Sequence, residues 1–176
     1  MALAHSPRII TDGLVLCLDA GNTKSYPGSG TSWSDLSGQG NTGTLTNGPT
    51  YNSTNGGSLV FDGTNDYVST GLVLPSPSTT PTTFDLVFKY NSSSTFRGLI
   101  GSSAYRSTGF SVGFMGQSSM RMTYNASSSS YENNWSYDSS VISNGTFVFN
   151  GRNISVYRNG SLITTYTASF DVAQNA

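Results

Sequence analysis

Several residues that usually carry catalytic or metal chemistry are scarce in this chain of 176 residues. It has one cysteine, Cys17, and one histidine, His5. A single cysteine excludes an internal disulfide framework, and a Ser-His-Asp or Cys-His site needs a histidine beside its nucleophile. His5 falls in a predicted N-terminal arm, residues 1–11, so we expect neither kind of site. Cys17 stands in the apolar run "GLVLCLDAG", which predicts a buried, inert thiol.

Glutamate is as rare as histidine, since Glu132 is the only one in the sequence. Glycoside hydrolysis needs two carboxyl groups held close together, one of them with a raised pKa. Glu132 stands in a stretch of serine and asparagine, without a carboxylate pair beside it. We therefore predict that the protein is not an enzyme.

Charge is also sparse, at 10% of the residues with a formal net charge of −1. Without a block of lysine or arginine, we expect no nucleic-acid partner. No apolar run reaches the length of about 18 residues needed to span a membrane. The first residues lack the apolar centre of a secretion signal. The composition nevertheless resembles that of an extracellular protein. A virion protein that is released by cell lysis would explain both observations, and so would a chain whose signal has been removed. A virion surface location and an extracellular one are therefore both open on this ground.

Glycine, serine, threonine and asparagine are abundant instead, and 12% of the residues are aromatic. Short apolar or alternating runs are separated by turn-forming clusters, which indicates about ten to thirteen strands in a sandwich or jelly roll. We predict an all-β, antiparallel two-sheet sandwich as a single domain over residues 12–176. The first strand is predicted at Gly13–Asp19, and the run Ser127–Ser130 is predicted to belong to a polar loop. Asn159-Gly160 between alternating runs predicts a type I′ hairpin.

The acidic stretch "FDGTNDYV" allows two interpretations. Asp62, Asn65 and Asp66 carry hard oxygen atoms that suit calcium, but calcium takes about six to eight oxygen ligands. We expect no cofactor, and calcium is the one metal that this stretch could bind.

The other interpretation is a turn between two strands. Gly63 accepts a positive φ, and the side chains of Asp62 and Asn65 can bond to nearby backbone groups. In that arrangement Phe61 and Tyr67 point inward. We favour the turn.

Aromatic residues in polar stretches form a further candidate site. Tyr105 and Arg106 stand in "SAYRS", whereas Tyr131, Trp135 and Tyr137 stand in "YENNWSYD". Aromatic faces beside amide groups suit a glycan. The same residues also serve as anchors of subunit contacts, so both interpretations stay open.

Four phrases, "DGLVLCLDAGN", "SWSDLSGQGNTGTLTNG", "GSLVFDGTNDYV" and "VYRNG", resemble concanavalin A-like, laminin-G-type (LamG-like) domains. The resemblance is closest to those of bacteriophage structural proteins. It covers most of residues 12–167. The matching residues include Trp33, Asp35, Phe61, Asp62, Gly63, Asp66, Tyr67, Tyr157, Asn159 and Gly160.

This resemblance implies a jelly roll of two sheets and a non-enzymatic virion structural protein. We expect a capsid decoration (cement) protein or a tail-associated adhesion module on the phage exterior. Its partners are then further copies of itself and other virion proteins, such as the major capsid protein. The alternative is a secreted carbohydrate-binding (lectin-like) module.

The end of the chain departs from the family pattern. Members continue past the "YRNG" hairpin to a final strand beside the first one, whereas this sequence ends at Ala176. We expect the last strand of the family to be missing. Another subunit could supply it, an early N-terminal segment could take its place, or the chain could be a fragment.

Overall fold

The computed structural model describes residues 10–73, 80–91, 97–101, 110–115, 119–124, 129–134, 141–151 and 153–167. These residues form antiparallel sheets, and their only helix is a short 3₁₀ helix, η1 (Thr54–Gly56). The all-β class predicted from the sequence is confirmed. The chain divides into two compact units, unit 1 (Met1–Val73) and unit 2 (Leu74–Ala176). The single domain predicted over residues 12–176 stays a prediction.

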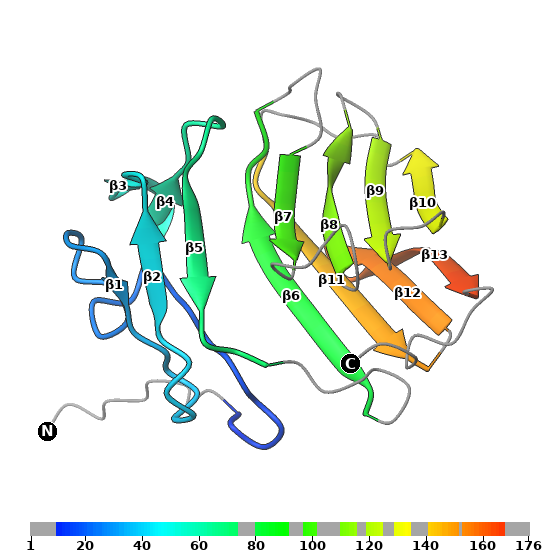
Figure 1. The fold of residues 1–176 in the computed structure, drawn as a ribbon, viewed down its shortest axis with the longest axis horizontal. Coiled ribbons are helices and arrows are strands. Elements are labelled where there is room, and N and C mark those ends of the chain that lie inside the picture. Colours follow the sequence, from blue (N-terminus) through cyan, green and yellow to red (C-terminus); the bar gives the residue numbers. More distant parts are fainter. Residues whose placement is uncertain are drawn as a thin grey trace, which may run out of the picture. The chain divides into compact units, whose positions relative to one another are not determined.

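Unit 1 contains two small antiparallel sheets (Figure 1). One has the strand order β1-β2-β5 and the other pairs β3 with β4. The strands are β1 (Ser32–Trp33), β2 (Gly43–Thr46), β3 (Thr50–Asn52), β4 (Ser58–Val60) and β5 (Tyr67–Thr70). Strands this short bury little surface of their own, so long connecting segments must hold them in place.

Two connecting segments of unit 1 cross at glycines. A Cβ atom built on Gly21 would lie 2.3 Å from the carbonyl oxygen of Gly56. One built on Gly57 would lie 2.8 Å from the carbonyl oxygen of Ala20 and from the hydroxyl of Tyr51. Only glycine allows two backbones to approach this closely.

The strand predicted at Gly13–Asp19 is wrong, because these residues belong to no ladder. Side chains take the place of strand partners. The backbone N–H of Cys17 donates to Asp35 Oδ1 at 2.9 Å, and the carbonyl oxygen of Val15 accepts from Asn41 Nδ2 at 2.8 Å. One backbone bond, from Leu36 N–H to the Cys17 carbonyl at 2.9 Å, completes the attachment.

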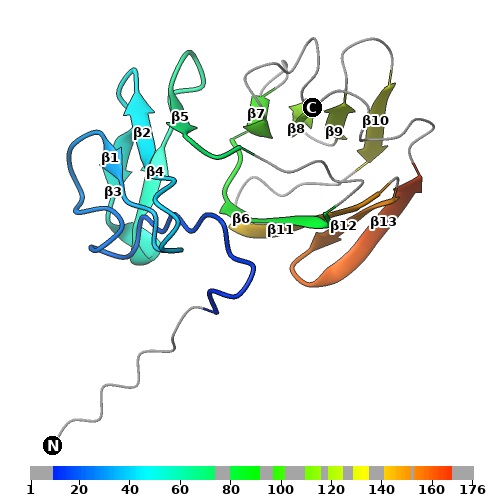
Figure 2. The ribbon, with the colours of Figure 1, turned by 60° about the horizontal axis from the view of Figure 1, so that its bottom comes forward.

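Unit 2 contains two four-stranded antiparallel sheets that form two layers (Figure 2). Their strand orders are β10-β9-β8-β7 and β13-β12-β11-β6. The first sheet holds β7 (Arg97–Gly101), β8 (Phe110–Met115), β9 (Ser119–Tyr124) and β10 (Ser129–Asn134). The second holds β6 (Thr82–Phe88), β11 (Ser143–Asn150), β12 (Asn153–Arg158) and β13 (Ser161–Thr167).

The core of unit 2 lies between these two sheets. From residue 143 to residue 149, β11 alternates between buried and half-buried residues, as expected for a strand with one face in a core. Phe147 of β11 is fully buried and pairs in register with Phe84 of β6 and Val156 of β12. Phe114 of β8 meets the ring of Phe88 at a centroid distance of 5.6 Å, which joins one sheet to the other.

The predicted Asn159-Gly160 hairpin is confirmed. It joins β12 to β13 with Arg158 opposite Ser161. Asn159 and Gly160 both have positive φ, 48° and 78°, as a type I′ turn requires.

The predicted polar loop beginning at Ser127–Ser130 is wrong in part, because β10 begins at Ser129 and pairs along its whole length with β9. The segment lacks an apolar alternation, and among the described residues β10 lies at the end of its sheet, with β9 as its one neighbour. Its strand conformation therefore depends on its neighbour rather than on its own composition.

Candidate functional site

The stretch Asp62–Asp66 forms a turn that its own carboxylates stabilise. Asp62 Oδ1 accepts from the backbone N–H of Thr64 at 2.7 Å and of Asn65 at 3.4 Å. Asp66 Oδ2 accepts from the N–H of Asp62 at 3.0 Å. The Thr64 N–H is the main cause of the lowered pKa of Asp62, because it favours the charged carboxylate.

The carboxylates of Asp62 and Asp66 thus stabilise the backbone of the turn through hydrogen bonds. Gly63 has a φ of 74°, which a turn at this position requires. Within the part of the chain that the structure describes, no group of three or more histidine, cysteine, aspartate or glutamate side chains is placed to hold a metal ion. In the described part of the chain, no further acidic side chain therefore lies beside the three weak calcium candidates, Asp62, Asn65 and Asp66.

The turn also has a topological role that the sequence did not predict. β4, before it, pairs with β3, whereas β5, after it, pairs with β2. The two strands therefore belong to different sheets, and the turn carries the chain from one to the other. The resemblance implies a connector between two adjacent strands, but these two strands do not pair with each other.

The predicted inward orientation of Phe61 and Tyr67 is also wrong. Phe61 is 45% exposed and Tyr67 is 51% exposed. Phe61 lies just beyond the end of β4. On β5 the inward position belongs to Val68, whose Cγ1 atom would be 2.8 Å from a Cβ built on Gly43. Neighbouring residues of a strand point to opposite faces, so Tyr67 points out.

Val60, Phe61 and Tyr67 stand on either side of this turn in the chain, and we call these three residues the turn-flanking apolar surface. Val60 is 44% exposed, so all three side chains leave a large part of their apolar area in solvent. Large exposed apolar side chains within one short segment are typical of a protein–protein contact. This surface is the strongest candidate contact site in unit 1.

A second aspartate, Asp35, holds the Gly-rich loop of unit 1. Its carboxylate accepts from the backbone N–H groups of Cys17, Ser37 and Asn41, each at 2.9 Å, and from Ser37 Oγ at 2.7 Å. Burial alone would raise the pKa of Asp35, but these hydrogen bonds hold it below its ordinary value. These hydrogen bonds give Asp35 a structural role, which is to hold the backbone of the loop.

The two remaining predicted residues of unit 1 pack beside this loop. Trp33 is half-buried, and its ring lies 6.5 Å from that of Tyr26 in an edge-on arrangement. Cys17 is half-buried, and its pKa is raised by burial and by the charges of Asp19 and Asp35. A raised pKa disfavours the reactive thiolate, which agrees with an inert thiol.

Most of the predicted aromatic site falls outside the described residues. This holds for Tyr105, Arg106, Trp135 and Tyr137. Tyr131 lies on β10, where its backbone pairs with Met122. The interpretation of these five residues as a glycan or subunit contact therefore stays a prediction.

One polar cluster was missed by the sequence analysis. Asp85, Asn144 and Thr146 lie on neighbouring strands of unit 2 and contact one another through their side chains. The signal that could have found them is the alternation of polar with buried residues in "TTFDLVF" and "SNGTFVFN". Their proximity depends on strand register, which a single strand does not reveal.

A scan of protein-family models finds no match for this chain, and the searches of curated proteins and of solved structures find none either. The resemblance to LamG-like domains thus continues to rest on the sequence motifs. In the described residues, no helix is long and apolar enough to cross a membrane.

Proposed function

We propose that this chain is a non-enzymatic structural protein of a phage exterior, acting as a capsid decoration (cement) protein or a tail-associated adhesion module. In this proposal the chain is a LamG-like jelly roll. It assembles with further copies of itself and with other virion proteins such as the major capsid protein. The observation that carries the proposal is the turn-flanking apolar surface of Val60, Phe61 and Tyr67.

The chemistry of the acidic residues supports the same function. Asp35, Asp62 and Asp66 accept hydrogen bonds from backbone N–H groups, so they hold loops in shape. Rigid loops present a contact surface without an entropy cost at the moment of binding. A low net charge of −1 also lets like subunits approach each other without strong repulsion.

The first test is the oligomeric state of the purified chain, measured by size-exclusion chromatography with light scattering, in calcium and then in EDTA. We expect an oligomer of the same size in both. Replacing both aromatic residues (Phe61→Ser and Tyr67→Ser) should weaken assembly by at least about tenfold, since aromatic anchors dominate interface energies. The matched control is Val87→Ser, because Val87 is 74% exposed on unit 2. A monomer that calcium stabilises would contradict the proposal.

A second test addresses the virion location. An antibody raised against the chain should label intact phage particles in immunogold electron microscopy, on the capsid or on the tail. Labelling of soluble material alone, with clean particles, would contradict a virion role and favour the secreted alternative.

A further inference from the structure

Asparagine is followed directly by glycine at five places in this chain, all of them among the described residues. The pairs are Asn47-Gly48, Asn55-Gly56, Asn144-Gly145, Asn150-Gly151 and Asn159-Gly160. Glycine has no Cβ atom, so its backbone nitrogen can approach the carboxamide of the asparagine before it. That approach begins the loss of the side-chain amide by cyclisation. The surroundings of each asparagine therefore decide which pair can react.

Hydrogen bonds engage three of the five carboxamides. Asn47 Nδ2 donates to the carbonyl oxygen of Asn65 at 2.7 Å. Asn144 Nδ2 donates to Asp85 Oδ1, and Asn159 Oδ1 accepts from the backbone N–H of Asn144 at 2.8 Å. Each of these carboxamides must give up its bond before it can turn toward the next backbone nitrogen, which disfavours cyclisation there.

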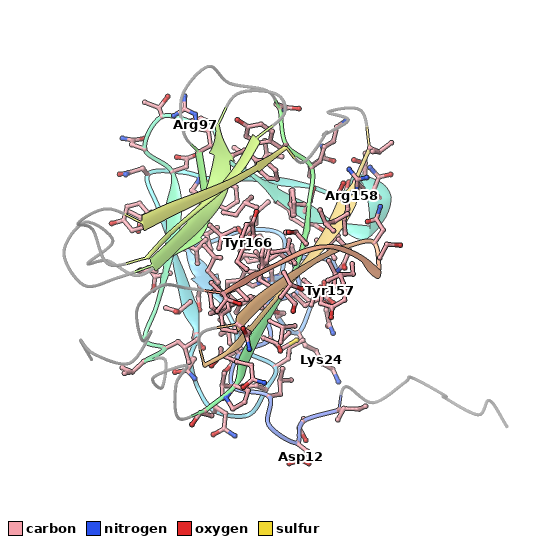
Figure 3. All side chains as sticks on the ribbon, turned by 90° about the vertical axis from the view of Figure 1, so that its right-hand side faces the viewer. Asp12, Lys24, Arg97, Tyr157, Arg158 and Tyr166 are labelled. Atoms are coloured by element: carbon pink, nitrogen blue, oxygen red, sulfur yellow. The ribbon has the colours of Figure 1, made fainter. Side chains whose placement is uncertain are left out.

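The sheet pairing of unit 2 restrains two of the pairs through their backbone. Gly145 lies within β11 and has ladder partners on both sides, Leu86 on β6 and Arg158 on β12, the latter labelled in Figure 3. Asn150 is the last residue of β11, and it pairs with Asn153. Ladder bonds break only when the strands separate, so cyclisation at these positions requires part of the sheet to open.

Asn55 has neither kind of restraint. It lies in η1, whose three residues are all exposed, and its carboxamide has no hydrogen-bond partner among the described residues. Its φ of 56°, in the left-handed region like those of Asn47 and Asn159, is one that residues with a side chain rarely adopt. A single exposed turn that contains such a residue opens at a low free energy. Cyclisation at Asn55 therefore needs only a local opening.

The reacting peptide lies where two backbones of unit 1 touch. A Cβ atom built on Gly21 would lie 2.3 Å from the carbonyl oxygen of Gly56, and one built on Gly57 would lie 2.8 Å from the carbonyl oxygen of Ala20. We call this contact the glycine crossing. So close a contact cannot accept an additional backbone atom without a shift of one segment. A change that lengthens the chain between Asn55 and Gly56 must therefore displace it.

We propose that Asn55-Gly56 is a site of spontaneous deamidation, and that the product loosens the glycine crossing. The backbone nitrogen of Gly56 attacks Cγ of Asn55 and forms a cyclic succinimide. Nδ2 leaves as ammonia and takes the proton of the Gly56 N–H with it. Water then opens the ring. Cleavage between the nitrogen and Cγ gives aspartate, whereas cleavage between the nitrogen and the backbone carbonyl carbon gives isoaspartate.

Isoaspartate carries the main chain through Cβ and Cγ, so it adds one backbone atom before the nitrogen of Gly56. Closure of η1 would then push the Gly56 carbonyl against Gly21. Both products also add a negative charge to a chain whose formal net charge is −1. The reaction consumes only water, so it proceeds without an enzyme and records the age of the chain. This inference goes beyond the proposed function, because neither assembly nor a virion location requires it.

The first test compares the five pairs in the full chain. The protein is incubated in mildly alkaline buffer, because base removes the proton of the attacking N–H. Peptide mapping by mass spectrometry measures the conversion of amide to acid, and an isoaspartate-specific methyltransferase identifies isoaspartate. We expect Asn55 to convert fastest, by about threefold or more. Conversion that is equally fast or faster at another pair would overturn the proposal.

The second test asks whether the glycine crossing controls the reaction. Gly21→Ala places a methyl group against the Gly56 carbonyl and should open η1 more often, so conversion at Asn55 should become at least about threefold faster, with Asn159 unchanged. The matched control is Gly71→Ala, because a Cβ at Gly71 meets nothing within 4 Å. An unchanged or slower conversion at Asn55 in Gly21→Ala would contradict the link to the crossing.

The third test separates the structural consequence from the reaction itself. Wild-type protein that has been incubated until Asn55 has converted should show faster hydrogen exchange at Gly21 and Gly57 than fresh protein does. Asn55→Gln is the unreactive control, since glutamine would have to form a larger ring, and its exchange should not change with incubation. Circular dichroism verifies that each variant is folded beforehand. Conversion at Asn55 without any change in exchange would refute the loosening of the crossing.

Discussion

The strands of unit 1 have two to four residues, whereas those of unit 2 have five to eight. The number of buried apolar residues is also smaller in unit 1 than in unit 2. Among the described residues, unit 1 has three, Ala20, Tyr26 and Leu45, against seven in the core cluster of unit 2. Unit 1 instead has Asp35, with four hydrogen bonds to its carboxylate, and a glycine crossing. Short strands can therefore be held by backbone-directed polar bonds, whereas long strands rely on burial.

The largest effect should come from the core of unit 2. Phe147→Ala removes a fully buried ring and leaves a cavity, so we expect a loss of about 3–5 kcal/mol in the free energy of unfolding. Urea unfolding measures the loss, and hydrogen exchange locates it. We expect exchange to increase in β6, β11 and β12. An equal increase in exchange throughout unit 1 would contradict a separate stabilisation of the two units, since it would mean that both units unfold together.

The next effect concerns the glycine crossing of unit 1. Gly21→Ala places a methyl group against the Gly56 carbonyl, which should cost about 2–3 kcal/mol because backbone must move. Gly71→Ala is the matched control: a Cβ at Gly71 meets nothing within 4 Å, and its φ, like that of Gly21, is not positive. Thermal unfolding of the two variants gives the difference. Equal melting temperatures would show that the crossing is not a constraint in solution.

A smaller effect should follow from the loss of the Asp35 carboxylate. Asp35→Ala leaves the N–H groups of Cys17, Ser37 and Asn41 without their acceptor, and we expect a loss of about 1–2 kcal/mol because those groups regain water. Denaturant titration at neutral pH measures it. The matched control is Asp12→Ala, an exposed residue near the start of the described chain.

Acid should reproduce part of this loss. The pKa of Asp35 is lower in the folded protein than its ordinary value, so the folded state binds the proton less readily than the unfolded state does. The stabilisation is complete above the ordinary carboxyl pKa and is lost as the pH falls through the folded pKa. Stability measured from neutral pH downward should therefore fall less steeply in Asp35→Ala. An identical acid dependence in both proteins would contradict this role.

The smallest effect separates two contributions of Asn159. Asn159→Gly retains the positive φ but removes the bond to the Asn144 N–H, and should cost about 0.5–1 kcal/mol. Asn159→Ala also places alanine, which tolerates the left-handed region less well than asparagine or glycine, at a φ of 48°, and this adds about 1 kcal/mol. Chemical denaturation of both variants gives the two values. If the glycine variant is the less stable one, the turn conformation is not the limiting feature.

Local patterns were sufficient for much of unit 2. The apolar and polar residues of "TTFDLVF" alternate, which is typical of a strand with one face in the core, and this stretch is β6. The Asn159-Gly160 pair predicted its turn from backbone sterics alone. These features depend on residues close in the chain, which is why the sequence by itself determined them.

Only the tertiary structure decided which groups meet across the chain. The apolar run Gly13–Asp19 resembles a strand, yet the side chains of Asp35 and Asn41 take the place of strand neighbours. β10 has little strand signal of its own and depends on β9 for its ladder. Tyr67 points outward because Val68 takes the inward position of β5, and strand register places Asp85 in line with Tyr157 across the sheet. Partner choice and register are long-range properties, and no single segment encodes them.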